Sequence, residues 1–190
     1  MKFYSNLVTP ASTPAVTLAA FKGFVRQDHD HEDSTLQILL DAATAQAESY
    51  VQASLMRQTR RVSITGTPPT EITLDMGPVQ GITSITYKDL NNVTQTISSS
   101  DYVLNGDTVT PAPGKAWPLV STAAPDGFKV TYMAGIIDTS VSPVASLPKQ
   151  YTAAILLLGQ IKYDRNVDEQ EMLEKSAYTL LDTVRNGQGI

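Results

Sequence analysis

The spacing of hydrophobic residues changes twice along the chain, near residue 57 and again near residue 147. In the first and last zones apolar residues recur every three or four positions, as on one face of an α-helix. In the middle zone they alternate with polar residues, as in a β-strand. The pattern therefore predicts a helical zone, a β zone and a second helical zone.

The first zone predicts two helices. Thr17 is suited to be the N-cap of a short helix that runs to about Arg26, because its side chain can accept a hydrogen bond from the first turn. Ser34 and Gln37 stand at the spacing of a capping box and predict the start of a second helix that ends near Leu55. This second helix carries one narrow apolar seam, formed by Leu36, Leu40, Ala43, Ala47 and Tyr50. A seam of this kind needs a partner helix to cover it.

The middle zone predicts short strands separated by clusters of Gly, Pro, Asn and Ser. Alternating apolar positions run from Val62 to Val109, and residues 128–134 form the last expected strand. Asn105-Gly106 predicts a two-residue hairpin, because both turn positions need a positive φ, which Asn and Gly tolerate best.

The third zone predicts two more helices. Pro148 is tolerated in a first helical turn, and residues 151–161 are apolar on nearly every side, so this helix is expected to be the most buried element. A last helix is expected from about Asp168 to Arg185, with Gly187 just beyond its end. Its apolar face includes Leu173, Leu180 and Leu181.

These elements predict an α+β fold, in which the N- and C-terminal segments form one helical bundle with an antiparallel β subdomain inserted between them. The helical domain comprises residues 16–57 and 147–187, and the β subdomain residues 58–146. Residues 1–15 are expected to form a flexible N-terminal arm and residues 188–190 a loose C-terminus.

Composition and charge exclude several classes of protein. The chain of 190 residues has no cysteine, which excludes a disulfide scaffold, a thiol nucleophile and a thiolate zinc site. Its 19 acidic and 14 basic side chains give a net charge of −5, the wrong sign for tight nucleic-acid binding. The longest apolar stretch, 153–159, is far shorter than the roughly 20 residues of a membrane-spanning helix. We also find no secretion signal, so the expected compartment is the cytoplasm of the producing cell.

The strongest candidate for chemistry is the acidic loop from Asp28 to Asp33, which holds both histidines of the chain. A calcium loop that began at Asp28 would need Gly and Glu where Asp33 and Leu39 stand. His29 and His31 are two residues apart, whereas helical zinc enzymes use histidines four apart. We therefore interpret the segment as a solvated loop, and we expect no metal, no cofactor and no catalytic residue. An enzyme would need this loop to bind a metal ion.

Several segments, taken together and in order, resemble the head-tail connector, or head-completion adaptor, proteins of tailed bacteriophages, prophages and gene transfer agents. The four main segments are 16–26 with the acidic loop after it, 42–59, 77–87 and 147–165, which ends in Tyr163-Asp164-Arg165. Smaller similarities occur at Asp101-Tyr102, Trp117-Pro118 and 130–135.

The resemblance implies a structural virion protein of the neck, assembled in the cytoplasm of the host bacterium. Such a protein forms a homo-oligomeric ring, commonly a dodecamer, between the portal protein and a tail-side stopper or tail terminator. DNA would pass through the ring without specific binding, and no membrane is involved. A ring subunit must keep apolar surface for its neighbours, so the contact candidates are Leu36, Leu40, Ala43, Ala47, Tyr50, Leu156, Tyr163, Arg165, Leu173, Leu180 and Leu181.

An alternative function is a phage-encoded binding module whose Thr-rich β region recognises a sugar or a host surface. That function would need an exposed aromatic platform. The only tryptophan, Trp117, lies in a Pro-rich loop, and we expect it to pack beneath that loop.

Overall fold

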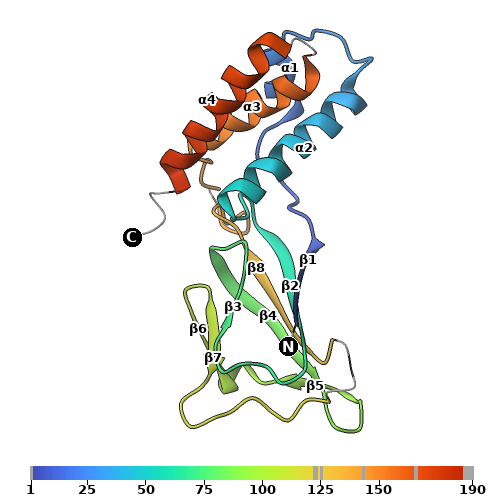
Figure 1. The fold of residues 1–190 in the computed structure, drawn as a ribbon, viewed down its shortest axis with the longest axis vertical. Helices are drawn as coiled ribbons and strands as arrows, with labels where there is room; N and C mark the ends of the chain where they lie inside the picture. Colours follow the sequence, from blue (N-terminus) through green and yellow to red (C-terminus); the bar gives the residue numbers. More distant parts are fainter. Residues whose placement is uncertain (1, 122–123, 125, 143, 165–166, 186–190) are drawn as a thin grey trace. The chain divides into compact units, whose positions relative to one another are not determined.

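The computed structural model describes residues 2–121, 124, 126–142, 144–164 and 167–185 (Figure 1). The chain divides into two compact units, one of residues 1–12 and 56–144 and the other of residues 13–55 and 145–190. The first, here called the β unit, contains the described strands, and the second, the helical unit, contains the four described α-helices. The predicted α+β fold is confirmed, because helices lie on both sides of a series of antiparallel strands in the sequence.

The main sheet of the β unit has five strands in the order β1-β2-β8-β4-β5, and each strand is antiparallel to its neighbours. The strands are β1 (Lys2–Thr9), β2 (Gln58–Thr65), β8 (Phe128–Ala134), β4 (Val79–Lys88) and β5 (Thr94–Ile97). Val62, Val130 and Ile85 are register partners across the three central strands and are all buried. Because side chains alternate along a strand, the opposite face of the sheet is formed by polar residues such as Arg61 and Ser84.

The N-terminal segment differs from the flexible arm that the sequence suggested. Residues 2–9 form β1, which pairs with β2 from Lys2, opposite Thr65, to Thr9, opposite Thr59. All eight side chains of β1 are exposed. The strand therefore lacks the alternation of buried and exposed residues by which a strand is recognised from sequence.

A second sheet of the β unit has three strands in the order β3-β7-β6. These strands are β3 (Ile72–Thr73), β7 (Thr108–Pro111) and β6 (Tyr102–Asn105). The short 3₁₀ helix η1 (Ser99–Asp101) precedes β6. The predicted hairpin between β6 and β7 is present, but Asn105 pairs with Thr108, so Gly106 and Asp107 form the turn. Gly106 takes the positive φ of 58°. Asp107 is held in place because its Oδ1 accepts the N–H of Val79 at 2.7 Å and its backbone oxygen accepts the N–H of Leu74 at 2.8 Å.

The helical unit consists of α1 (Leu18–Val25), α2 (Asp33–Val51), α3 (Lys149–Tyr163) and α4 (Val167–Arg185). α3 contacts each of the other three helices. Its fully buried residues are Tyr151, Ala154, Ile155, Leu158 and Gly159, whereas Leu156 and Leu157 are half-buried. The expected central position of this helix is confirmed, but only one of its faces is fully enclosed.

The helix ends follow the sequence signals in part. Thr17 caps α1 as predicted, because its Oγ1 accepts the N–H of Ala20 at 3.3 Å. The predicted capping box of α2 is wrong: the N-cap is Glu32, which makes no side-chain capping bond, and Gln37 donates to Asp41 Oδ1 at 2.8 Å instead. α2 also ends earlier than expected, at Val51, because Gln52 adopts a left-handed φ of 57°. No helix within the described residues is long and apolar enough to cross a membrane.

Candidate interface groove of the helical unit

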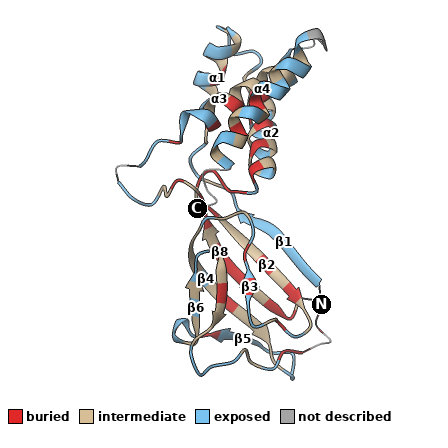
Figure 2. Cartoon of the chain, turned by 60° about the vertical axis from the view of Figure 1, so that its left-hand side comes forward, coloured by how far each residue is buried: buried red, intermediate tan, exposed pale blue. Residues whose placement is uncertain are grey.

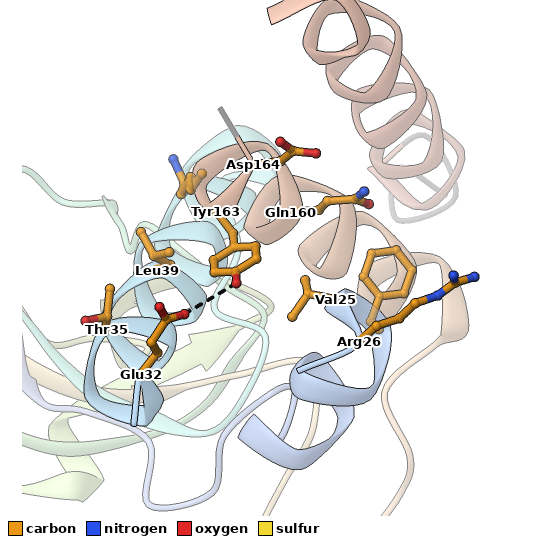
Figure 3. A pocket seen from close by; sticks show the side chains of 10 residues that line it. Val25, Arg26, Glu32, Thr35, Leu39, Gln160, Tyr163 and Asp164 are labelled. Carbon is orange, nitrogen blue, oxygen red and sulfur yellow. Dashed lines mark hydrogen bonds between the residues drawn. The ribbon is translucent and has the colours of Figure 1, made fainter. Parts of the chain in front are cut away.

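A groove of about 1000 Å³ lies where α1 ends, α2 begins and α3 ends (Figure 3). Its lining residues come from all three helices and are Phe24, Val25, Arg26, Glu32, Thr35, Leu39, Gln160, Lys162, Tyr163 and Asp164. Two segments that carry the resemblance, 16–26 and 147–165, are far apart in the sequence and meet here. We call this feature the α1–α3 groove.

The wall of the groove is shaped by the end of α1. Arg26 takes a left-handed φ of 57° and its N–H bonds to the backbone oxygen of Lys22, which ends the helix and turns the chain. The side chain of Lys22 then reaches across the acidic loop, with its Nζ 2.5 Å from Asp30 Oδ1 and 2.7 Å from Asp33 Oδ1. These hydrogen bonds raise the pKa of Lys22 and lower the pKa of Asp30. The acidic loop is therefore tied to α1 by a single cation.

Three side chains at the groove form one hydrogen-bonded group. Gln27 Nε2 donates to the Tyr163 hydroxyl at 2.5 Å and to Glu32 Oε2 at 3.0 Å. The Tyr163 hydroxyl donates to Glu32 Oε2 at 3.3 Å, and Figure 3 shows this hydroxyl directed at the carboxylate. The group joins the loop after α1, the N-cap of α2 and the last residue of α3.

The chemistry of the α1–α3 groove suits contact with another polypeptide. Val25 and Leu39 give it half-buried apolar surface, and Phe24 is exposed at 41%. The exposed rim carries two cations, Arg26 and Lys162, and two carboxylates, Glu32 and Asp164. Apolar side chains combined with polar groups of both charge signs are a usual composition of protein–protein contact surfaces.

The acidic loop is solvated at both histidines. His29 and His31 are exposed, with their rings 5.5 Å apart. Among the described residues, no three His, Cys, Asp or Glu side chains are grouped in a way that could hold a metal ion.

The structure corrects the expected contact role of the α2 seam. Leu36, Leu40, Ala43 and Ala47 are buried inside the helical unit, as is Leu181 of α4. α1, α3 and α4 of the same chain all contact α2. These five buried residues therefore belong to the core of the helical unit and are not available to a neighbouring subunit. The periodicity indicates a face that needs a partner helix, but it does not indicate that later helices of the same chain cover this face.

The other expected contact residues keep exposed surface, with one exception that lies outside the described residues. Leu156, Leu173 and Leu180 are half-buried, and Tyr163 lines the α1–α3 groove. Tyr50 is held by α4: its hydroxyl donates to Asp182 Oδ1 at 2.8 Å and its ring lies 4.5 Å from that of Tyr178. Arg165, the remaining expected contact residue, lies outside the residues that the structure describes.

Trp117 packs under its loop, as the sequence predicted. Its indole N–H donates to the backbone oxygen of Pro69 at 2.8 Å, and its ring meets Phe128 edge-on at 5.4 Å. The residue is partly buried and packs against the hydrophobic core of the β unit. It is therefore not the exposed aromatic platform that a sugar-binding module would need.

Comparison with known proteins identifies the class. Residues 15–112 match the family described as "Phage gp6-like head-tail connector protein". The chain belongs to this family, which is a class of structural connectors and not of enzymes. Membership places the protein in the neck of a phage or phage-like particle, between head and tail. No curated protein matches the chain.

Solved structures show the same fold. A chain from the "Virion of native gene transfer agent (GTA) particle" is 25% identical with a TM-score of 0.68, and the match covers 86% of each chain. A chain from the "Neck of empty GTA particle computed with C6 symmetry" is 22% identical with a TM-score of 0.68, covering 86% of this chain and 85% of that one. A chain from the "Neck of native GTA particle computed with C12 symmetry" is 24% identical with a TM-score of 0.66 and the same coverage.

Proposed function

We propose that this protein forms a homo-oligomeric ring of twelve subunits that joins the portal of a phage or phage-like head to the tail and lets DNA pass. The observation that carries the proposal is the family match together with the likeness to chains of gene transfer agent particles, one of whose necks is described with C12 symmetry. The proposed partners are further copies of the chain, the portal protein and a tail-side stopper or tail terminator. The role is structural and includes no catalysis.

The net charge of the chain supports a channel that does not bind DNA tightly. The sequence of the helical unit carries 7 basic and 12 acidic side chains, and that of the β unit carries 7 of each. The whole excess of five negative charges therefore belongs to the helical unit. Each phosphate contact made by a cation strengthens binding to the duplex, so a ring of subunits with a net negative charge favours movement of DNA.

Two surfaces of the helical unit are proposed as contacts. The α1–α3 groove would receive the neighbouring copy in the ring, because it combines apolar surface with a rim of both charge signs. The outer face of α4 would contact the portal, because Met172 is exposed at 65% there while Ala177 and Leu181 face the core. Leu156, Leu173 and Leu180 would contribute their half-buried surface to these contacts.

The ring is tested by electron microscopy of the purified chain, alone and mixed with its portal. Annuli are expected at least in the presence of the portal, since ring closure can need a template. Absence of annuli in both preparations, together with no incorporation into particles, would contradict the proposal. A monomeric state of the isolated chain would not.

The contact of α4 with the portal needs a finer test than its removal, because Ala177 and Leu181 are part of the core. Met172→Glu changes only an exposed position of α4. We expect it to weaken portal binding in a pull-down while the melting temperature stays unchanged. A matched control is Ile38→Glu, at a position of α2 that is exposed at 67%. Equal binding by wild type and both variants would exclude α4 as the portal contact.

A further inference from the structure

The outer edge of β1 has no partner within the described residues. β1 is the first strand in the sheet order, so its backbone bonds on one side to β2 while its other side is open. Figure 2 shows the strand in pale blue, exposed along its length, beside β2. An open edge presents unpaired N–H and C=O groups, and it is a template on which another strand can pair.

β1 carries little of the protection that edge strands usually have. Charged side chains and proline normally prevent an edge from pairing with another chain. Between residues 2 and 9 there is no proline and only one charge, that of Lys2. Four of the eight residues are large, exposed and hydrophobic: Phe3, Tyr4, Leu7 and Val8. The register irregularity between Leu7 and Thr9 leaves residues 2–7 in regular pairing.

The opposite edge of the same sheet is β5. Among the residues that the structure describes, this strand pairs with β4 alone, and Thr94, Gln95 and Thr96 are exposed. The sheet therefore ends in two different open edges, a longer apolar one and a shorter polar one. Two different edges are what a head-to-tail contact requires, because such a contact joins unlike surfaces of identical subunits.

The direction of the strands also matches a ring. Each of the five strands is antiparallel to its neighbours, so β1 and β5, the first and the fifth, point the same way. Rotation about a ring axis keeps the direction of strands that run along that axis. β1 of one copy would therefore meet β5 of the next as a parallel pair. Pairing of β1 with β1 would instead be antiparallel and would end at a two-fold dimer.

The alternation of side chains is continuous across the sheet as well. One row of register partners lies on the polar face and consists of Tyr4, Ser63, Lys129, Thr86 and Thr96. Asn6 lies on the same face as Tyr4, and Thr94 on the same face as Thr96, because side chains two apart in a strand share a face. A parallel pair of β5 and the next β1 can thus keep one face polar and the other apolar.

From these observations we infer that the open edge of β1 pairs with β5 of the neighbouring copy, so that the five-stranded sheets join into one continuous sheet around the assembly. The occupant of the edge is a second copy of this chain, and the contact is made mainly by backbone hydrogen bonds. This inference rests on the proposed ring. Residues 2–9 lie outside the matched segment 15–112, so the family match does not itself imply this contact.

The absence of cysteine from the chain allows a cross-linking test without background. One double variant combines Asn6→Cys with Thr96→Cys. A second combines Asn6→Cys with Thr94→Cys and covers a two-residue shift of register. Each of the three single substitutions serves as a control. Annuli assembled with the portal are oxidised mildly and separated on a denaturing gel. We expect at least one double variant to give a ladder that extends beyond the dimer, with no ladder from any single variant. A covalent dimer from Asn6→Cys alone would overturn the inference in favour of β1 pairing with β1.

A second measurement covers the case in which no pair of cysteines reaches disulfide geometry. Tyr4→Lys places a protecting charge on the edge, and Leu90→Lys is the matched control, at a position of the β unit that is exposed at 70%. Tyr4→Lys is expected to lower the yield of annuli about tenfold and the control to leave it unchanged. If Tyr4→Lys forms annuli in normal yield and the double variants give no cross-links, the inferred strand pairing is wrong, whereas the proposed ring still stands. Absence of annuli from the wild type would overturn both.

Discussion

The ring of Phe21 lies against the backbone of Gly159, with its Cε2 atom 2.7 Å from the point that a Cβ of residue 159 would occupy. Phe21 is fully buried and comes from α1, while Gly159 is in the middle of α3. Glycine normally weakens a helix interior, so its presence in α3 has a packing reason. The missing side chain lets the ring of Phe21 approach the α3 backbone.

We therefore expect Gly159→Ala to destabilise the protein by about 1–3 kcal/mol, because the added methyl group overpacks the core. Gly23→Ala is the control, since a Cβ there meets nothing within 4 Å and the position is helical. That variant should gain about 0.5–1 kcal/mol. Chemical denaturation measures both. Combining Phe21→Leu with Gly159→Ala should recover part of the loss, and a purely additive double variant would contradict the proposed contact.

A second prediction concerns the buried hydroxyl of Tyr132. It donates to the backbone oxygen of Asp75 at 3.0 Å and to Asp75 Oδ1 at 2.5 Å, and the same carboxylate oxygen accepts from Ser5 Oγ at 2.8 Å. Tyr132→Phe removes the donor and leaves Asp75 with fewer partners. We expect a loss of about 1–3 kcal/mol in the free energy of unfolding. Ser5→Ala, at an exposed position, should cost less, and an equal cost for both would contradict this ranking.

The same tyrosine should make stability depend on alkaline pH. Burial, followed by the hydrogen bond to Asp75, raises the pKa of Tyr132 well above its ordinary value of 10.0. The folded state thus holds the phenol proton more tightly than the unfolded state. The stabilisation of the folded state by protonated Tyr132 is complete below pH 10 and is lost as the pH rises above 10. Unfolding measured from pH 8 to 11 should show a steeper decline for wild type than for Tyr132→Phe, and identical slopes would exclude this effect.

The rim of the α1–α3 groove gives a test of the proposed neighbour contact. Lys162→Glu reverses an exposed charge of the rim, and Lys149→Glu reverses an exposed charge at the first turn of the same helix, outside the groove. We expect the yield of annuli to fall about tenfold for Lys162→Glu only, since like charges across a contact repel. Circular dichroism melts control for folding, because the reversal also removes a favourable charge near a helix C-terminus. Equal yields from both variants would argue against the groove as a contact.

Elements whose burial follows a regular period can be predicted from the sequence. The four helices and the strands from β2 to β8 follow from apolar spacing, because each of these elements packs against the interior of its own unit. β1 was missed because its side chains are exposed and its stability comes from the backbone of β2. The turn of the β6–β7 hairpin lies one residue later than the predicted Asn105-Gly106. The reason is that Asp107 Oδ1 accepts the N–H of Val79, a long-range contact that local turn preferences do not contain.

The candidate site was harder to predict than the fold. The α2 seam looked like a surface for neighbours because sequence shows which residues are apolar but not which segment covers them. The α1–α3 groove depends on Gln27 meeting Tyr163 across 136 positions. The one signal for it was the resemblance, which singled out the segments around Arg26 and Tyr163 without placing them together.

The division of the chain has a consequence for synthesis on the ribosome. The two halves of the helical unit, 13–55 and 145–190, are translated with nearly the whole β unit between them. All five strands of the main sheet have emerged once Ala134 has left the exit tunnel, so this sheet can close early. Leu36 and Leu40, in contrast, stay uncovered until α3 appears. The nascent chain therefore completes its sheet first and its bundle last, which makes the apolar side of α2 the surface that a chaperone would meet.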